Sequence, residues 1–298
     1  EIGTAFVDTV LGTIDVSQLR PLKVIADTGN GMVGPILERV YKALPVDLIG
    51  MYLDPDGSLP NHGLDPMQEE HRIDLVRRVC EEQADVGFSF DGDGDRFFVI
   101  DDRGEFVPGD FLTALMASYI LERHPGGKII YDVRCSWAVP ESIEAAGGEA
   151  LIERVGHAFI KPRMFEEGAI FAGELSGHYY FRDFFGADSG IVPSLFLLEI
   201  LSRRGPLSQQ LAQFESNYFI SSEINSEVAD PQAKIAEIAE RYRNGYIEYL
   251  DGISVSFTDW HFNVRPSNTE PLLRLNLEGK SRDLMESKRD EVLRLIRS

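Results

Sequence analysis

Short apolar segments alternate with helical segments through the first two thirds of the chain, and no other feature constrains the fold as strongly. In the first hundred residues, strand patterns are separated by segments of helical spacing. We predict strands at 22–27, 46–51, 85–90 and 97–100, and helices at 33–44 and 71–82. In the second helix the apolar face is predicted to comprise Ile73, Val76, Val79 and Cys80. This order predicts an α/β unit whose site lies at the ends of its strands.

A second unit repeats this pattern, with strands predicted at 128–131, 150–152 and 169–172 and helices at 111–123, 139–146, 158–166 and 195–203. The last part differs, because strand patterns at 218–228, 253–257, 260–264 and 272–277 outnumber the helical segments 232–243 and 284–296. The predicted fold class is therefore α/β, with two similar α/β domains of mixed sheets followed by a smaller α+β C-terminal domain. The predicted domain bounds are 1–107, 108–216 and 217–298.

The composition argues against several classes of protein. The formal net charge of −20 provides no cationic field for general nucleic-acid binding. No segment approaches the roughly 20 consecutive apolar residues of a membrane helix. The two cysteines, Cys80 and Cys135, are too few for a disulfide framework and indicate a reduced, cytoplasmic protein. The chain opens at Glu1 and shows no signal peptide, and this start hints at a removed upstream segment.

Three aspartates occupy alternate positions in residues 91–96, Asp91-Gly92-Asp93-Gly94-Asp95-Arg96, which we call the aspartate loop. Two carboxylates about 4 Å apart repel by about 4 kcal/mol at an effective dielectric of about 20. A hard divalent cation is the simplest reason for three to coexist. Arg96 suits a phosphate oxygen, and an oxygen-ligand metal beside an arginine indicates phosphoryl chemistry.

Other interpretations of the aspartate loop fit less well. An EF-hand needs Gly at its sixth position and Glu at its twelfth, where this chain has Arg96 and Asp102. A phosphatase of the haloacid dehalogenase type would use Asp91 as nucleophile and Asp93 as a second acid. However, Asp95 stands where that motif needs a hydroxyl residue. A solvated acidic turn is the remaining alternative.

A second polar loop, residues 173–178, follows the strand at 169–172, and we call it the glutamate loop. Glu174 can accept two hydrogen bonds from vicinal hydroxyls. Ser176 and His178 add the mixed donors and acceptors that a sugar requires. The alternative is an ordinary loop whose polar groups cap nearby backbone.

Residues 265–271, the arginine loop, form the third candidate. The guanidinium of Arg265, the hydroxyls of Ser267 and Thr269, the amide of Asn268 and several backbone N–H groups suit an anion. The alternative is an N-cap cluster before a helix, which the strand-like residues 272–275 make less favourable.

Two further basic residues are ambiguous on sequence alone. His157 precedes Lys161 by four residues, so on a helix the two side chains share one face. A lone histidine is more often structural than functional. Arg134 follows the strand at 128–131, and its default interpretation is a surface arginine.

Taken together, the aspartate, glutamate and arginine loops resemble the α-D-phosphohexomutase superfamily over the whole chain, most closely its bacterial phosphomannomutase and phosphomannomutase/phosphoglucomutase branch. Residues 27–31 and 59–62 add supporting matches. The resemblance implies four domains around a central cleft, three of them similar α/β units and the last one smaller. It implies Mg²⁺ as cofactor and a hexose 1,6-bisphosphate as intermediate or activator.

The same resemblance implies a role for each candidate residue. The metal ligands would be Asp91, Asp93 and Asp95; the sugar ligands Glu174 and Ser176, with His178 close by; and the ligands of the non-transferred phosphate Arg265, Ser267, Asn268 and Thr269. Arg96, His157 and Arg134 would be catalytic, and Arg134 stands where relatives usually carry a lysine.

One element of the superfamily does not occur in the sequence. Its first domain carries a phosphorylated serine in a loop similar to Thr-Ala-Ser-His-Asn-Pro, and residues 1–298 contain no such loop. The expectation is therefore a chain made of the second, third and fourth domains, inactive alone and lacking an N-terminal domain as partner. The expected reaction of the complete protein interconverts hexose 6-phosphate and hexose 1-phosphate, with mannose favoured over glucose. A non-catalytic phosphosugar-binding module is the alternative.

Overall fold

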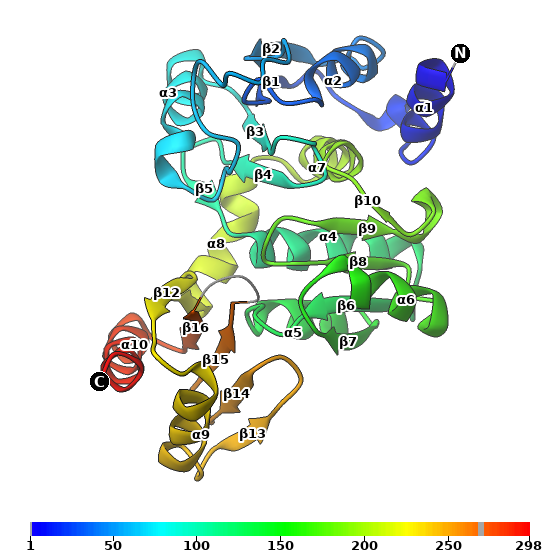
Figure 1. The fold of residues 1–298 in the computed structure, drawn as a ribbon. Helices are drawn as coiled ribbons and strands as arrows, with labels where there is room; N and C mark the ends of the chain where they lie inside the picture. The colour runs from blue at the N-terminus through cyan, green and yellow to red at the C-terminus, as the bar shows by residue number, and fades with distance from the viewer. Residues whose placement is uncertain (1, 268–270) are drawn as a thin grey trace.

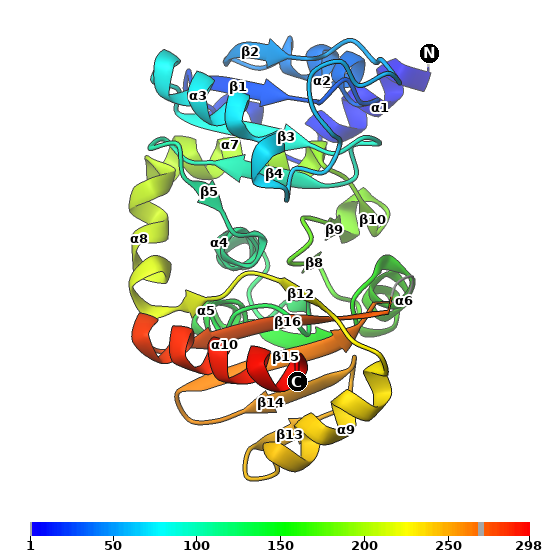
Figure 2. The ribbon, with the colours of Figure 1, turned by 60° about the vertical axis from the view of Figure 1, so that its left-hand side comes forward.

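The computed structural model describes residues 2–267 and 271–298. Three sheets follow one another along the molecule, from the N-terminal sheet at the top of Figure 1 to the C-terminal sheet at the bottom. Figure 2 shows the same stack from another side, with the C-terminal helix lying along the third sheet. The fold class predicted from the sequence, two mixed α/β units followed by a smaller sheet domain, is confirmed.

The first sheet has the strand order β2-β1-β3-β4-β5. Its strands are β1 (Lys23–Asp27), β2 (Asp47–Met51), β3 (Val86–Phe90), β4 (Phe97–Ile100) and β5 (Phe106–Val107), and its helices are α2 (Gly34–Tyr41) and α3 (Ile73–Glu82). The strands β1, β2 and β3 are parallel, whereas β4 returns antiparallel to β3. The aspartate loop is the connection between β3 and β4.

The apolar face predicted for α3 is partly wrong. Leu75 and Val79 are buried, whereas Ile73 is 58% exposed and Cys80 is also exposed. The reason lies at Gly87 of β3, where an added Cβ would come within 2.6 Å of Val79 and 3.2 Å of Leu75. Because this strand position has no side chain, the helix approaches the sheet with these two residues, and Ile73 remains outside.

The second sheet repeats this arrangement, with the order β10-β9-β8-β6-β7. Its strands are β6 (Lys128–Asp132), β7 (Glu149–Glu153), β8 (Phe171–Gly173), β9 (Tyr179–Phe181) and β10 (Ala187–Asp188), and its helices are α4 (Gly109–Arg123), α5 (Ala138–Ala145), α6 (His157–Glu167) and α7 (Ile191–Arg204). Here β6, β7 and β8 are parallel and β9 is antiparallel to β8. The glutamate loop connects β8 to β9.

The first two units share one hydrophobic core. One buried cluster includes residues of β1, β3, α4, α7 and β8. Helix α7 contacts both α4 and β4, so it lies between the two sheets. The hydroxyl of Tyr41 on α2 donates to Ser194 Oγ on α7 at 2.8 Å. This continuous core fixes the aspartate and glutamate loops relative to each other.

The third sheet has the order β11-β16-β15-β14-β13, and β12 also pairs with β16. Its elements are β11 (Phe219–Ile220), β12 (Ile224–Glu227), α9 (Pro231–Arg241), β13 (Tyr246–Glu248), β14 (Ile253–Ser256), β15 (Trp260–Pro266), β16 (Leu272–Gly279) and α10 (Arg282–Ile296). This sheet has a hydrophobic core of its own. The single edge strand predicted at 218–228 is wrong, because Ser222 has a φ of 58° and divides it into β11 and β12.

Several elements were not predicted from the sequence. They are the short strands β5, β9, β10 and β13, the helices α1 (Ile2–Leu11) and α8 (Leu207–Asn217), and the short 3₁₀ helices η1 (Val16–Gln18), η2 (Glu69–His71) and η3 (Arg182–Phe184). Helix α8 connects the second unit to the third sheet. Among the described residues, no helix is both long and apolar enough to cross a membrane.

Candidate active site

The aspartate loop begins directly after β3, at the carboxyl end of this strand. One carboxylate oxygen from each of Asp91, Asp93 and Asp95 lies within 4.8 Å of the other two. Gly94 has a φ of 77°, which lets the loop turn so that alternate carboxylates converge. Asp91 accepts hydrogen bonds from the N–H groups of Gly94 and Arg96, both at 3.2 Å. The structure therefore brings together the three aspartates predicted as metal ligands.

The electrostatics of these aspartates fit a cation. Burial raises the pKa of Asp91 to about 6. The interaction with His178 lowers the pKa of Asp95. The Oδ1 atom of Asp95 is buried and makes no hydrogen bond to the described residues, although Nε2 of His178 lies 3.5 Å away. A buried acceptor without a donor, beside two more carboxylates, matches the oxygen ligands that Mg²⁺ takes in proteins.

Arg96 and His178 join the aspartate loop to the glutamate loop. The Nε atom of Arg96 lies 3.3 Å from Oδ2 of Asp91 and 3.4 Å from Nε2 of His178. Burial opposes protonation of His178, but Asp95 and Glu174 outweigh burial and raise its pKa. Two loops more than 70 residues apart in the sequence therefore line one site.

Glu174 is almost completely buried at the end of β8. Its Oε1 atom accepts the Tyr180 hydroxyl at 2.5 Å, and its Oε2 atom accepts the Gly156 N–H at 2.9 Å. Burial, followed by the nearby charge of Asp132, raises the pKa of Glu174. Both carboxylate oxygens thus accept neutral donors, which sugar hydroxyls can replace without a change in charge.

Arg134 is buried at the end of β6, so its default interpretation as a surface arginine is wrong. Its Nε and one terminal nitrogen donate to the two carboxylate oxygens of Asp132, each at 2.9 Å. The same terminal nitrogen lies 3.4 Å from Ser176 Oγ, which is 3.1 Å from Nδ1 of His178. The Leu175 N–H also donates to Asp132 at 2.8 Å. Through these contacts to Leu175 and Ser176, the Arg134–Asp132 ion pair supports the glutamate loop.

His157 is the first residue of α6, and its side chain is exposed. The preceding residue, Gly156, donates its N–H to Glu174, so His157 lies next to the glutamate loop. The ammonium group of Lys161, four residues later, donates to Asp188 at 2.7 Å. The two residues lie on one helix as predicted, but Lys161 already has a carboxylate partner.

The third sheet turns a polar face toward the second unit. In β15 and β16, one set of alternate residues is apolar and enters the core, and the other set is polar. Across the two strands, the polar residues form the pairs His261–Glu278, Asn263–Asn276 and Arg265–Arg274. At one end, the Trp137 ring stacks on His261 with centroids 4.3 Å apart, and the backbone N–H of Trp137 donates to Glu278 Oε2 at 3.1 Å. This contact holds the polar face against α5.

The other end of this face carries two arginines. Arg265 and Arg274 are directly opposite each other, and such like-charged pairs are destabilising without an anion. The Nε atoms of both are buried and have no hydrogen-bond partner in the described part of the chain. A terminal nitrogen of Arg265 lies 3.9 Å from Oδ2 of Asp251. Burial, followed by the charge of Arg134, lowers the pKa of Arg265. These unpaired donors fit an anion with several oxygens.

Of the other predicted residues of the arginine loop, the structure describes Ser267. The backbone N–H of Ser267 donates to the Leu272 carbonyl at 2.9 Å. Asn268 and Thr269 lie outside the described residues.

Sequence reasoning missed four residues of this site: Asp132, Tyr180, Glu223 and Arg274. Arg274 had a signal, because it interrupts the apolar strand Leu272-Leu273-Arg274-Leu275. Glu223 had none, because its position depends on the break between β11 and β12.

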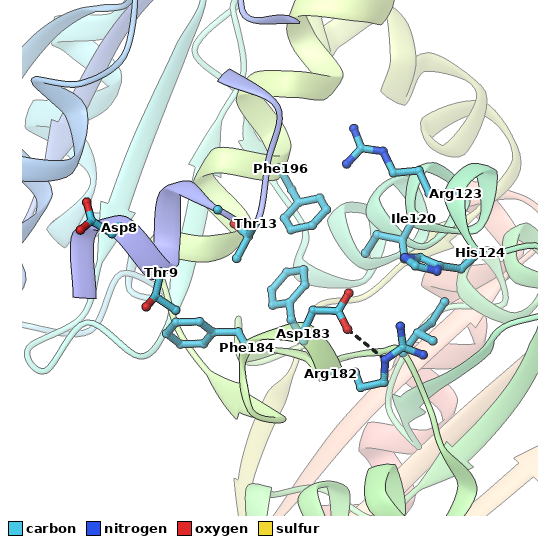
Figure 3. Close-up of a pocket in the computed structure, with 13 residues that line it drawn as sticks. Asp8, Thr9, Thr13, Ile120, Arg123, His124, Arg182, Asp183, Phe184 and Phe196 are labelled. Atoms are coloured by element: carbon cyan, nitrogen blue, oxygen red, sulfur yellow. Dashed lines mark hydrogen bonds and ion pairs between the residues drawn. The ribbon is translucent and has the colours of Figure 1, made fainter. Parts of the chain in front are cut away.

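A separate cavity of about 230 Å³ lies between α1 and the second unit (Figure 3). Its lining includes Phe184, Phe196 and Arg182, whose guanidinium pairs with Asp183 at 3.0 Å. The cavity contains none of the candidate site residues. We therefore place the site at the three loops.

Comparison with known proteins finds similarity along nearly the whole chain. Residues 4–104 match alpha/beta/alpha domain II of phosphoglucomutase/phosphomannomutase, residues 108–218 match its alpha/beta/alpha domain III, and residues 223–295 match its C-terminal domain. The matches occur in the same order as the three sheets.

Individual relatives agree with these matches. A phosphomannomutase of Salmonella montevideo is 42% identical over 99% of this chain, and the phosphohexose mutases of Xanthomonas campestris pv. campestris are 40% identical over 99%. A crystal structure of a phosphoglucomutase/phosphomannomutase family protein from Burkholderia thailandensis superposes with a TM-score of 0.90 at 34% identity, covering 99% of this chain. The chain spans 66% of the length of each of the two relatives and 64% of the Burkholderia chain. The chain thus belongs to the phosphoglucomutase/phosphomannomutase family, in the bacterial phosphomannomutase branch of the α-D-phosphohexomutase superfamily.

Proposed function

We propose that this chain forms the metal-, sugar- and phosphate-binding part of an enzyme that reversibly interconverts hexose 6-phosphate and hexose 1-phosphate. The observation that carries the proposal is a chain of contacts from the aspartate loop through the glutamate loop to Arg274, which lies opposite Arg265 of the arginine loop. Asp95 lies 3.5 Å from His178, and Ser176 lies 3.4 Å from Arg134. Arg134 lies 3.5 Å from Glu223, which binds Arg274 at 3.0 Å. A chain of side-chain contacts therefore links the carboxylates of the aspartate loop, the polar side chains of the glutamate loop and the guanidinium groups of Arg134 and Arg274.

Each group in this chain of contacts has a proposed role. Asp91, Asp93 and Asp95 would hold Mg²⁺, which when bound offsets negative charge on a phosphoryl group. Arg96, beside these carboxylates, would stabilise the charge that develops on the transferred group, with Arg134 and His157 completing the catalytic set. Glu174, Ser176 and His178 would bind the sugar, and Arg265, Ser267, Asn268 and Thr269 the phosphate that is not transferred.

For the complete enzyme we propose phosphoryl transfer by way of a bound 1,6-bisphosphate. A phosphoserine would give its phosphoryl group to the sugar, and the bisphosphate would turn over in the site and return the other phosphoryl group. Residues 1–298 contain no loop similar to Thr-Ala-Ser-His-Asn-Pro. The nucleophile would therefore come from an N-terminal domain, and we expect the 298-residue chain alone to show negligible mutase turnover.

Mannose 6-phosphate is the proposed preferred substrate and glucose 6-phosphate a second one. The assignment rests on Asn268, the residues around His178 and the similarity to the Salmonella phosphomannomutase. Steady-state kinetics of the full-length protein on the two sugars and on glucosamine phosphate test it. A clear preference for mannose is expected, and a strong preference for glucosamine phosphate would overturn the assignment.

We also propose the division into domains at 1–107, 108–216 and 217–298. Each range encloses one of the three sheets, which supports these bounds. Limited proteolysis followed by mass spectrometry tests the second boundary. Initial cleavage is expected near Gly205–Asn217, and initial cleavage inside the β6–β8 sheet would contradict it.

A non-catalytic phosphosugar-binding module is the second candidate. The unpaired Nε donors of Arg265 and Arg274 favour binding, whereas the chain has no serine loop to start the reaction. Calorimetry of the 298-residue chain with a hexose 1,6-bisphosphate should show weak binding, and no heat at millimolar ligand would reject both candidates. If the chain does bind the bisphosphate, mutase activity of the full-length protein distinguishes the enzyme from the module.

A further inference from the structure

Glu223 lies between two arginines that come from different units. Its Oε1 atom accepts a terminal N–H of Arg274 at 3.0 Å, and its Oε2 atom lies 3.5 Å from a terminal nitrogen of Arg134. The side-chain amide of Asn276 also donates to Oε2 at 3.4 Å. The Glu223 side chain is only 12% exposed. A largely buried carboxylate therefore spans the junction between the second unit and the third sheet.

A bulge in the backbone aims this carboxylate at the arginines. The Ser221 N–H still donates to the Leu277 carbonyl of β16, and pairing resumes at the start of β12. Between these points two residues, Ser222 and Glu223, lie opposite the single residue Asn276. Ser222 has a φ of 58°, a region that residues other than glycine seldom occupy. Bulges and such strained positions often re-aim a side chain next to a functional site.

The arginines that contact or neighbour Glu223 have binding capacity left over. Arg274 uses a terminal nitrogen for Glu223, while its Nε is buried with no partner among the described residues. Arg265, directly opposite on β15, has the same unpaired Nε. The negative charge of Glu223 is close enough to Arg265 to raise its pKa, against the larger effect of burial. A phosphate bound to this pair would therefore lie within the field of the Glu223 carboxylate.

We propose that Glu223 is a positioning residue that competes with phosphate for Arg274. Without phosphate, its carboxylate holds Arg274 and Arg134 in place. With phosphate bound, the two anions share the Arg274 guanidinium, and their repulsion weakens phosphate binding and speeds its release. The inference rests on the proposed function, because it takes phosphate as the ligand of this arginine pair. A carboxylate that served only as a structural bridge would have the opposite effect, since its loss would loosen the arginines and weaken binding.

Isothermal calorimetry of the 298-residue chain with inorganic phosphate tests this competition. Glu223→Gln keeps the shape of the side chain and removes its charge, so phosphate should bind about tenfold more tightly. Glu227→Gln is the matched control, because Glu227 is the last residue of the adjoining strand β12, is exposed and undergoes the same charge change. The control should bind phosphate as the unmodified chain does. Equal or weaker phosphate binding by Glu223→Gln would overturn the proposal.

Further variants separate this inference from the proposed function. In an Arg274→Gln background, Glu223→Gln should give a smaller gain, because the shared guanidinium is gone. If Glu223→Gln does not fold, Glu223→Asp keeps the charge but withdraws it from both arginines, and a smaller gain in affinity is expected. If Arg265→Gln removes phosphate binding but neither Glu223 variant strengthens it, only the competition is wrong. If the unmodified chain binds no phosphate, both proposals fail.

Discussion

The aspartate loop and the glutamate loop occupy the same place in two sheets of the same strand order. Each connects the third strand of its sheet to the antiparallel fourth strand, β3 to β4 in one and β8 to β9 in the other. Arg96 and His178 are the last residues before these fourth strands, and they form an isolated antiparallel bridge with each other. The two units therefore meet through equivalent positions, and their loops face one site.

The difference between the two loops lies in how their carboxylates are satisfied. In the aspartate loop, three carboxylates converge and Oδ1 of Asp95 has no hydrogen bond within the described residues. In the glutamate loop, both oxygens of Glu174 accept neutral donors, Tyr180 and the Gly156 backbone, and the basic groups of Arg134 and His178 lie further away at 3.8 Å. One arrangement calls for a cation, and the other can exchange one neutral donor for another. The same scaffold thus serves two ligand chemistries because the loops differ, which agrees with the general independence of fold and function.

The largest expected effect comes from the ion pair beneath the glutamate loop. Arg134→Met would leave Asp132 buried without its cation, and breaking such a pair costs about 3–5 kcal/mol. Thermal unfolding should show this loss. The aspartate loop has no part in the pair, so Mg²⁺ binding measured below the unfolding temperature should persist. Arg154→Met, at an exposed position in the same unit, is the control. A loss below about 1 kcal/mol would show that the two loops do not differ in their support.

A smaller effect is expected from a buried acid of the second unit. Burial, together with the charge of Glu278, raises the pKa of Asp110 from 3.8 to about 7. The folded state holds the Asp110 proton more tightly than the unfolded state does. The contribution of this carboxyl to the free energy of unfolding is therefore fully present below pH 3.8 and is lost as the pH rises through about 7. Asp110→Asn removes this dependence, so the variant should gain on the order of 3 kcal/mol relative to the unmodified chain between pH 4 and pH 8. Denaturant unfolding at a series of pH values measures the difference, and parallel curves would contradict it.

The next effect concerns the cation itself. Asp93→Asn removes one of three converging charges at an exposed position, and we expect Mg²⁺ affinity to fall at least about 100-fold, since outer-shell changes alone cost about 10–100-fold. Calorimetry with Mg²⁺ measures it. Glu81→Gln, exposed on α3, is the charge-matched control. Glu174→Gln in the equivalent loop should leave Mg²⁺ affinity unchanged, and an equal loss there would break the distinction between the two loops.

Sequence patterns predicted most strands of the three sheets and both loops, because these depend on local chemistry. Alternating apolar residues specify β14 and β15, and glycine between acids specifies the turn at Gly94. The features that the sequence did not predict depend on contacts between residues far apart in the chain or on tertiary packing. Arg134 has its partner only two residues away, but its burial results from packing against the glutamate loop. Glu223 needs a bulge that β16 imposes from 50 residues further along the chain.

The sequence patterns predicted three separate loops, and local patterns could not show that the loops meet in one site. The contact between Arg96 and His178 arises because α7 packs between two sheets. The polar face of the third sheet is visible in the alternation of β15 and β16, yet the pairing of Arg265 with Arg274 requires the register of the hairpin. Family resemblance supplied the expectation that these loops meet.

The smallest effect tests how the aspartate loop is supported, because the buried carboxylate at the equivalent strand end has a different partner. Asp27, the last residue of β1, has His62 at 3.1 Å where Asp132 has Arg134. The support of the aspartate loop is steric and comes from the backbone of residues 28–32. The Met32 N–H donates to the Gly92 carbonyl at 2.8 Å. A Cβ added at Gly31 would lie 2.7 Å from the same carbonyl oxygen, which is closer than real contacts allow. Gly31 therefore lets the backbone approach the converging aspartates.

Gly31→Ala should shift Gly92 away and disturb the aspartates on either side of it. We expect Mg²⁺ affinity to fall about tenfold, as for other changes behind a metal ligand, while phosphate affinity is retained. Gly57→Ala is the control, because an added Cβ there would meet nothing within 4 Å. A change in thermal stability of about 1–3 kcal/mol with unchanged Mg²⁺ affinity would show instead that the crowding is absorbed away from the carboxylates. In that case the aspartate loop would be as independently braced as the glutamate loop, and the two would differ in ligand chemistry alone.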